Sequence, residues 1–267
     1  MVPNQYAVDL DSVEKVFNNG WRALGRIDLR VEPGEFVSLI GPSGCGKSTL
    51  LRLIANLHAP SAGSVRWWGE GFEAVGKAGR QLSFVFQEAT LMPWARVHDN
   101  VRLPLDLAGV DQTTARSRVA EALKQVGLDH MAHAYPHQLS GGMQMRVSIA
   151  RGLVSRPNLL LMDEPFGALD EFTRNRLDED LVKVCMEQKL TTFFVTHSLY
   201  EAVFLSSRIL VMAAHPGRIF AEYIIDPAII RDEAFRLSDA FAGMCRDVTR
   251  LLWEASRTEP VSQQRRS

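Results

Sequence analysis

The segment GPSGCGKST contains glycine, lysine and hydroxyl residues at a spacing that can bind nucleotide phosphates. It matches G-x-x-x-x-G-K-[ST] and follows a short apolar run. The glycines let successive backbone N–H groups face an anion, and the following helix adds positive potential. Lys47 would neutralise β- and γ-phosphate oxygens, and the Ser48 hydroxyl would bind Mg²⁺. The candidate nucleotide site therefore comprises Gly41, Pro42, Ser43, Gly44, Cys45, Gly46, Lys47, Ser48 and Thr49.

An acidic pair in LLLMDEP supplies a second set of candidate groups. Asp163 ends a short apolar run typical of a buried strand, and Glu164 follows it. Ligands of open α/β sheets collect at the carboxyl ends of the strands, where Asp163 could hold Mg²⁺ through water. Glu164 could polarise the water that attacks a γ-phosphate, which predicts a hydrolase.

Two other polar residues come at the ends of apolar runs. His197 follows FFVT, and Gln87 ends LSFVFQ. Either side chain could contact a γ-phosphate or orient water, but spacing alone leaves a structural role equally open.

Two further patterns favour structural interpretations. The spacing of His130, His133 and His137 is compatible with a metal site, but Pro136 indicates a loop, so we expect scattered polar histidines. The Cys45 thiol could act as a redox switch, yet we expect its backbone to matter more than its side chain.

The stretch LSGGMQMR predicts a second helix start that could bind an anion. Ser140 is a suitable N-cap, and Gly141 and Gly142 leave backbone N–H groups accessible. Apolar residues then recur at helical spacing until Pro157. An ordinary capped helix fits these residues as well.

The composition excludes several classes of protein. Hydrophobic residues make up 46% and charged residues 23% of the 267 residues, and the formal net charge is -1, so we expect no nucleic-acid partner. Three widely spaced cysteines indicate reduced thiols in a cytosolic protein. The apolar runs are too short to cross a bilayer, and the first residues do not resemble a signal peptide.

The pattern of elements predicts an α/β fold with a mostly parallel sheet, an antiparallel β side sheet and a helical lobe. Buried strands are expected in residues 33–41, 158–165 and 191–198, with a helix at 170–189 that completes a βαβ unit. Two more helices are expected at 48–57 and at 111–127, the second with Asp111 or a threonine as its cap. A final helix is expected near the C-terminus, where an apolar stripe is formed by Phe241, Met244, Val248 and Leu251. The final residues RTEPVSQQRRS are expected to be disordered.

The same pattern divides the chain into four parts. Residues 1–87 should hold the antiparallel β side sheet and the phosphate loop, and 88–157 a helical lobe. Residues 158–220 should complete the nucleotide-binding core, and 221–267 should form a C-terminal helix and tail.

Taken in order, the phosphate loop, FVFQ, LSGGMQMR, LLLMDEP, GALDEFTR and VTHS resemble the nucleotide-binding subunit of an ATP-binding-cassette (ABC) transporter. The resemblance covers about residues 8 to 220. It implies that Gln87 is the Q-loop glutamine, which senses Mg²⁺ and couples to membrane subunits. LSGGM resembles the signature motif, although Met143 stands where many members have glutamine.

The family also implies roles for other residues. Asp170 matches the D-loop aspartate, His197 the switch histidine, and Phe17 the aromatic that stacks on adenine. Two copies would pack head to tail, so that Ser140, Gly141 and Gly142 of one close on the ATP held by Lys47 of the other.

A narrower resemblance, in LMPWARVHDNV, FGALDEFTR and HPGRI, is to importers of the nitrate, sulfonate and taurine type. It implies transmembrane permease partners, a solute-binding protein and a place at the cytoplasmic face of the membrane. Candidate residues for the permease groove are Leu91, Met92, Pro93 and Trp94, although these could simply pack within the lobe.

Other functions fit less well. Exporter or lipid-transport subunits are the nearest alternative. A chromosome or repair ATPase would need a long coiled coil between Gln87 and Leu139, where no extended heptads occur. A soluble P-loop kinase would leave LSGGM unexplained.

Overall fold

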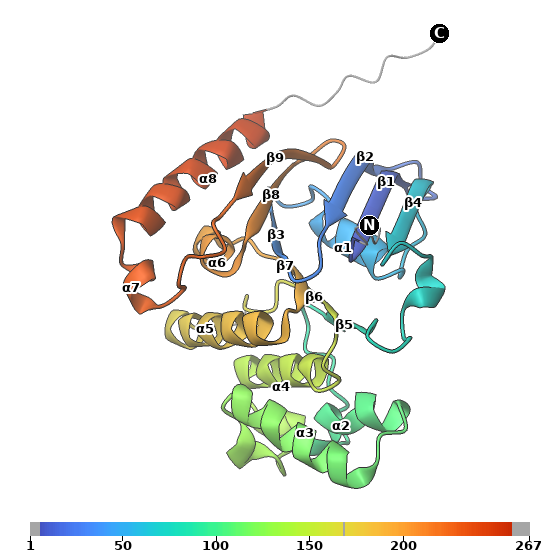
Figure 1. The fold of residues 1–267 in the computed structure, drawn as a ribbon, viewed down its shortest axis with the longest axis vertical. Coiled ribbons are helices and arrows are strands. Elements are labelled where there is room, and N and C mark those ends of the chain that lie inside the picture. The colour runs from blue at the N-terminus through green and yellow to red at the C-terminus, as the bar shows by residue number, and fades with distance from the viewer. Residues whose placement is uncertain (1–5, 168, 258–267) are drawn as a thin grey trace. The chain divides into compact units, whose positions relative to one another are not determined.

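The computed structural model describes residues 6–167 and 169–257 (Figure 1). The chain forms two compact units, one within residues 1–74 and 193–267 and the other within 75–192. Each unit combines strands and helices, so the predicted α/β class with parallel and antiparallel strands is confirmed. The four-part division expected from the sequence remains a prediction.

An antiparallel sheet of β1, β2 and β4 forms one layer of the first unit, as expected. Its strand order is β2-β1-β4, with β1 at Val8–Val16, β2 at Arg22–Val31 and β4 at Ala62–Trp67. The alternating burial along the second half of β2 is typical of a strand with one face on a core. Trp67 is buried at the end of β4 and donates its indole N–H to the Ile54 carbonyl at 2.8 Å.

Strand β3 carries the chain into the phosphate loop. It spans Phe36–Ile40, and all of its residues are buried. It pairs in parallel with β8 (Arg208–Ala213), which pairs antiparallel with β9 (Arg218–Ile224). Successive side chains of a strand point to opposite faces of the sheet, so a strand with every residue buried is covered on both faces. Strand β3 therefore gives the loop after it a rigid base.

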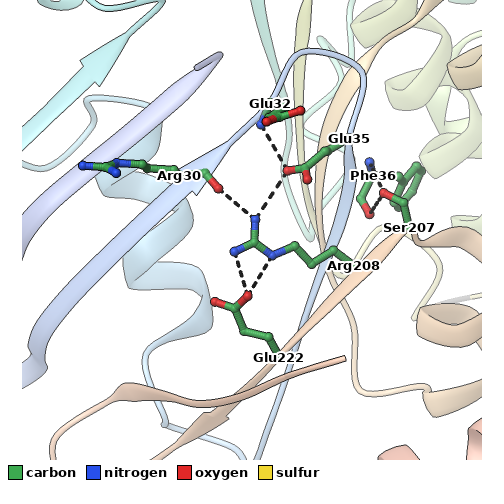
Figure 2. A network of polar contacts seen from close by, with 7 residues as sticks. All are labelled: Arg30, Glu32, Glu35, Phe36, Ser207, Arg208 and Glu222. Carbon is green, nitrogen blue, oxygen red and sulfur yellow. Dashed lines mark hydrogen bonds and ion pairs between the residues drawn. The ribbon is translucent and has the colours of Figure 1, made fainter. Parts of the chain in front are cut away.

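A polar network fixes the start of β3 (Figure 2). Arg208 on β8 donates to the Glu222 carboxylate on β9 at 2.8 Å and to the Arg30 carbonyl on β2 at 2.8 Å. The same guanidinium lies 3.5 Å from a Glu35 carboxylate oxygen in the turn before β3. Because Arg208 on β8 has partners on two other strands and in a turn, the network connects the antiparallel sheet to the strands behind the phosphate loop.

Helix α1 follows that loop at Lys47–Ile54. Its first residue is one position earlier, and its last residue three positions earlier, than the helix at 48–57 expected from the sequence. Asn56 has a left-handed φ of 54° and donates its backbone N–H to the Leu53 carbonyl at 3.0 Å, which ends the helix.

The C-terminal part of the chain belongs to the first unit. The helices there are α6 at Leu199–Leu205, α7 at Glu233–Arg236 and α8 at Asp239–Arg257. Helix α8 lies against α6, β8 and β9 (Figure 1). The buried residues of α8 are Phe241, Cys245, Val248 and Ala255. The predicted apolar stripe is therefore confirmed at Phe241 and Val248. It is wrong at Met244 and Leu251, which are only half-buried. The expected disordered tail lies outside the described residues beyond Arg257, which ends α8.

The expected βαβ order begins in the second unit and ends in β7, which runs into the first. Strand β5 at Leu82–Val85 pairs in parallel with β6 at Leu159–Asp163. Helix α5 at Glu171–Gln188 then leads to β7 at Thr191–Val195, where the chain passes into the first unit. Every residue of β6 and β7 is buried.

Three helices lie between β5 and β6 in the sequence of this unit. They are α2 at Val97–Leu107, α3 at Gln112–Gln125 and α4 at Gly141–Leu153, and they pack on one another. Asp111 caps α3 by accepting the backbone N–H groups of Thr113 and Thr114, as expected. Short 3-10 turns lie at Phe72–Ala74, Asp129–Met131 and Pro136–Gln138. Among the described residues, no helix combines the length and apolar character needed to span a bilayer.

Candidate nucleotide-binding site

The phosphate loop connects β3 to α1 with glycines in left-handed conformations. Gly44 and Gly46 have φ of 76° and 96°, which side chains rarely adopt. A Cβ on Gly46 would lie 2.5 Å from Leu24 Cδ2 and 3.1 Å from the Ala23 carbonyl oxygen, whereas one on Gly44 would meet nothing within 4 Å. Gly46 is therefore required both by its φ and by the close approach of β2.

Lys47 folds back over the loop and is only 7% exposed. Its ammonium donates to the carbonyls of Gly41 at 2.9 Å and Pro42 at 3.1 Å, and lies 3.9 Å from Cys45 Sγ. These partners are electrically neutral, so they solvate the ammonium without cancelling its charge. A buried cation held in this way favours an anion at the loop.

Cys45 is fully buried within the loop. Burial raises the pKa of its thiol, and the positive charge of Lys47 opposes that rise only in part. The thiol is therefore held in its neutral form, which is the less reactive one.

Phe17 lies in the turn between β1 and β2, in the same unit as the phosphate loop. Its ring stacks on that of Trp21, with centroids 5.6 Å apart and planes 11° from parallel. Phe17 was predicted to stack on adenine by resemblance, and this stays a prediction; the structure adds that Trp21 is the stacking partner of its ring.

His197 begins the loop after β7, in the same unit. Its neighbours are fixed on both sides: Thr196 is buried and donates to the Glu201 carboxylate, and Ser198 caps α6 by accepting the Glu201 N–H at 3.3 Å. The His197 side chain is exposed while its backbone is held, a geometry suited to contacting a ligand.

Asp163 and Glu164 lie at the carboxyl end of β6 in the second unit. Asp163 is 3% exposed. Glu164 has a left-handed φ of 47°, which is costly for a residue with a side chain and is often found at functional sites. The Gln87 amide Nε2 donates to Glu164 Oε2 at 3.4 Å, so the structure brings these two predicted residues together.

The signature stretch begins α4 as predicted. Ser140 is the N-cap, and its hydroxyl accepts the Met143 N–H at 3.3 Å. Ser140 and Gly141 are exposed, and a Cβ on Gly141 would meet nothing within 4 Å. The start of the helix is therefore open to a ligand from outside the unit.

Asp170 caps α5 in the same unit. Its carboxylate accepts the Thr173 N–H at 2.9 Å, and this hydrogen bond lowers the pKa of the carboxyl. Ala168 of the preceding GALDEFTR motif lies outside the described residues.

The loop after Gln87 is braced by two residues that sequence reasoning missed. Asn100 is fully buried, and its side chain accepts the Met92 N–H at 2.7 Å and donates to the Met92 carbonyl at 3.1 Å. Arg151 donates to the carbonyls of Ala89 and Thr90 at 2.9 and 3.0 Å. On this braced loop Trp94 is 77% exposed, whereas Leu91 and Met92 are half-buried.

The three histidines considered as metal ligands, His130, His133 and His137, lie in the segment before α4. No cluster of histidine, cysteine or acidic residues with the geometry of a metal site occurs in the part of the chain that the structure describes. His130, His133 and His137 are all exposed.

Known proteins are similar to this chain in sequence. Residues 24–167 match the ABC transporter family model. The aliphatic sulfonates import ATP-binding protein of Bacillus cereus is 44% identical over 215 residues, which are 79% of this chain and 83% of that protein. The taurine import ATP-binding protein of Rhizobium johnstonii is 46% identical over 204 residues, 76% of this chain and 77% of that protein.

A solved structure has the same fold. It is a dimeric ATP-binding cassette in a post-hydrolysis state bound to ADP and Pi, with a TM-score of 0.74 and 34% identity over 81% of this chain and 98% of that chain. The resemblance stated from the motifs is thus confirmed, both for ABC ATP-binding proteins and for sulfonate and taurine importers among them. The chain belongs to the ABC transporter family of ATP-binding proteins.

Proposed function

We propose that this protein is the ATP-hydrolysing subunit of an ABC importer for a small solute of the nitrate, sulfonate or taurine type. Support comes from the sulfonate and taurine import proteins, which align with more than three quarters of this chain. The observation that carries the proposal is Lys47, a buried ammonium held by neutral carbonyls inside a glycine loop at the start of α1. A site of this kind takes the β- and γ-phosphates of a nucleotide.

Mg²⁺ fits the oxygen donors that the family motifs assign to it. These are the Ser48 hydroxyl, the Gln87 amide oxygen and the Asp163 carboxylate. Mg²⁺ prefers oxygen ligands and would neutralise phosphate charge there. Because Gln87 donates its Nε2 to Glu164, its amide oxygen remains the acceptor end of the side chain.

Hydrolysis would depend on Glu164, Gln87 and His197. Glu164 is positioned as the base that takes a proton from the attacking water, and Gln87 orients its carboxylate. His197 would donate a hydrogen bond to the γ-phosphate from its fixed place after β7.

A second copy of the chain would complete the ATP site. The open start of α4, formed by Ser140, Gly141 and Gly142, would close on the γ-phosphate held by Lys47 of that second copy. Asp170 would lie near the same interface. Support comes from the dimeric state of the similar cassette, and pairing of identical surfaces is the commonest form of a homodimer.

The remaining partners would be transmembrane permease subunits, with a solute-binding protein acting through them. The braced loop that carries Leu91, Met92, Pro93 and Trp94 offers a surface for a permease helix. The subunit would then act at the cytoplasmic face of the membrane, where ATP is available.

An ATPase assay tests the proposal. The purified chain should hydrolyse ATP only with Mg²⁺, and Lys47→Ala should lose both ATP binding and hydrolysis. With its permease and binding protein in vesicles, the added sulfonate, taurine or nitrate should stimulate hydrolysis and enter the vesicles. Phosphate transfer to an added acceptor without hydrolysis would contradict the proposal, and efflux of the solute would contradict import.

A further inference from the structure

Helices α3, α4 and α5, which are labelled in Figure 1, line a cavity of about 480 Å³ in the second unit. The lining comes from the end of α3, the middle of α4 and the N-terminal part of α5. None of the described residues that line it belongs to the candidate nucleotide site. Its volume lies within the range of about 300–1,000 Å³ that is usual for small-molecule sites.

One part of the cavity wall is apolar. Val126 and Leu177 are buried there, and Phe172 lines the cavity with a side chain that is 83% exposed. A second void of about 20 Å³ also borders Val126 and Leu177 and has only apolar surface. An apolar group of a ligand would therefore find both a surface to pack on and space to enter.

Positive charge predominates in the rest of the lining. Each of the three helices contributes one cation, and these are Lys124, Arg146 and Arg176. The lining also has two acids, Glu121 and Asp180, but the Glu121 carboxylate is paired with Arg156 at 3.0 Å. Burial raises the pKa of the Asp180 carboxyl, although Arg176 opposes that rise, so negative charge is itself disfavoured at this residue. Three cations therefore outweigh the acidic groups that face the cavity.

The Arg146 guanidinium is only partly satisfied by the protein. Its Nη1 donates to the Val126 carbonyl at 3.3 Å, and its buried Nε has no hydrogen-bond partner among the described residues. Burial lowers the pKa of Arg146 and the charge of Arg176 lowers it further, whereas Asp170 raises it. Arginine stays charged in spite of such shifts. Two neighbouring guanidinium groups that repel each other, one with an unused buried donor, favour an anion between them.

We propose that this cavity binds a small organic monoanion, with its carboxylate between Arg146 and Arg176 and a short apolar body against Phe172, Val126 and Leu177. A carboxylate fits because guanidinium groups bind its two oxygens through paired hydrogen bonds. Asp180 disfavours a ligand with several negative charges. The site goes beyond the proposed ATP hydrolysis and does not depend on it, because it shares no residue with the nucleotide site.

Calorimetric titration of the full chain with benzoate tests the proposal. Benzoate combines a carboxylate with an apolar ring and should bind with roughly millimolar or better affinity, as its size allows. Benzamide has the same shape without the charge, and acetate has the charge without the ring. Each should bind at least about 10-fold more weakly than benzoate. Equal binding of benzamide, or no binding of benzoate, would overturn the proposal.

Substitutions then locate the bound anion. Arg176→Gln should weaken benzoate binding roughly 10- to 100-fold, the usual effect of losing a hydrogen bond to a charged group. Arg176 is exposed, so this variant should fold normally, as circular dichroism can verify. Arg146→Lys keeps the charge at the half-buried position and should retain part of the affinity. The matched control is Arg116→Gln, an exposed arginine on α3 outside the cavity lining, which should bind benzoate like the unaltered chain. Unchanged binding by Arg176→Gln, or an equal loss in Arg116→Gln, would contradict this site.

ATP and the phosphate loop provide the last control. Lys47→Ala should bind benzoate as the unaltered chain does, and saturating ATP should not compete with it. Competition by ATP that disappears in Lys47→Ala would place benzoate at the phosphate loop and overturn the proposal. Failure of the unaltered chain to bind ATP would contradict the proposed function alone and leave the benzoate result standing.

Discussion

Gln87 and Glu164 come from segments far apart in the sequence, yet their side chains are joined by a hydrogen bond of 3.4 Å. Gln87 follows β5, and Glu164 follows β6, the strand paired with β5 in parallel. The parallel pairing places the carboxyl ends of both strands at the same edge. The hydrogen bond restricts the orientation of the Glu164 carboxylate, which would suit the base proposed for ATP hydrolysis.

A double-mutant cycle tests this relationship. Glu164→Gln is expected to lower the hydrolysis rate roughly 10²- to 10⁴-fold, the usual contribution of a positioned base, while ATP binding persists and the dimer is trapped. Gln87→Ala should lower hydrolysis less, and should have little further effect when Glu164 is already replaced. Glu187→Gln, at an exposed position near the end of α5, is the control and should behave like the unaltered protein. Additive effects of the two substitutions would show that Gln87 does not act through Glu164.

The backbone at Glu164 predicts a trade-off between stability and activity. Its φ of 47° is unfavourable for glutamate and acceptable for glycine. Glu164→Gly should therefore abolish hydrolysis yet raise the free energy of unfolding by about 1 kcal/mol, relative to Glu164→Gln. Urea denaturation of the two variants measures the difference. Equal or lower stability of the glycine variant would show that the left-handed backbone stores no strain.

The two left-handed glycines of the phosphate loop should differ in their tolerance of alanine. Gly44→Ala adds a Cβ in open space and should cost about 1 kcal/mol of unfolding free energy, from backbone strain alone. Gly46→Ala should cost about 3 kcal/mol, because its Cβ also overlaps Leu24 and the Ala23 carbonyl. Urea denaturation distinguishes them, and equal costs would argue against close packing of β2 on the loop.

Ser140 is expected to act on the ATP of another copy. Ser140→Arg should leave ATP binding by the monomer nearly unchanged, while hydrolysis and ATP-dependent dimerisation fall. The substitution also removes a helix cap, which costs about 1 kcal/mol. Asp111→Ala, which removes the cap of α3 in the same unit, controls for that loss and should hydrolyse ATP normally. Equal loss of binding and hydrolysis in Ser140→Arg would refute the division of labour.

The cysteines should be inert in the folded protein. Burial raises the pKa of Cys185 to about 12 and that of Cys245 to about 11, and it also raises the pKa of Cys45. A raised pKa favours the thiol at every pH below it, so at pH 8 only about one Cys185 in ten thousand is ionised. Iodoacetamide at pH 8 should label none of the three residues until urea is added. Rapid labelling of Cys45 in the folded protein, prevented by ATP, would instead favour a redox switch at the loop.

Local sequence predicted most elements because their signals are local. The continuous apolar runs of β3, β6 and β7, and the cap of α3 at Asp111, depend on neighbouring residues only. The stripe of α8 was only partly predicted, because several apolar residues on that helix could face the core. The packing of α6, β8 and β9 selects Cys245 and Ala255, and local spacing carries no information about that packing.

The sequence by itself determined the phosphate loop, the signature helix and the acidic pair, because each motif consists of residues that are close in the chain. Tertiary structure alone decided which distant groups support them. Arg208 joins β8 to Glu222, Glu35 and the Arg30 carbonyl, and Arg151 and Asn100 brace the loop after Gln87. The stacking of Trp21 on Phe17 and the left-handed backbone of Glu164 also appeared only in the folded chain. The physical reason is that such contacts depend on which strands and turns become neighbours in space, and short-range residue patterns do not specify this.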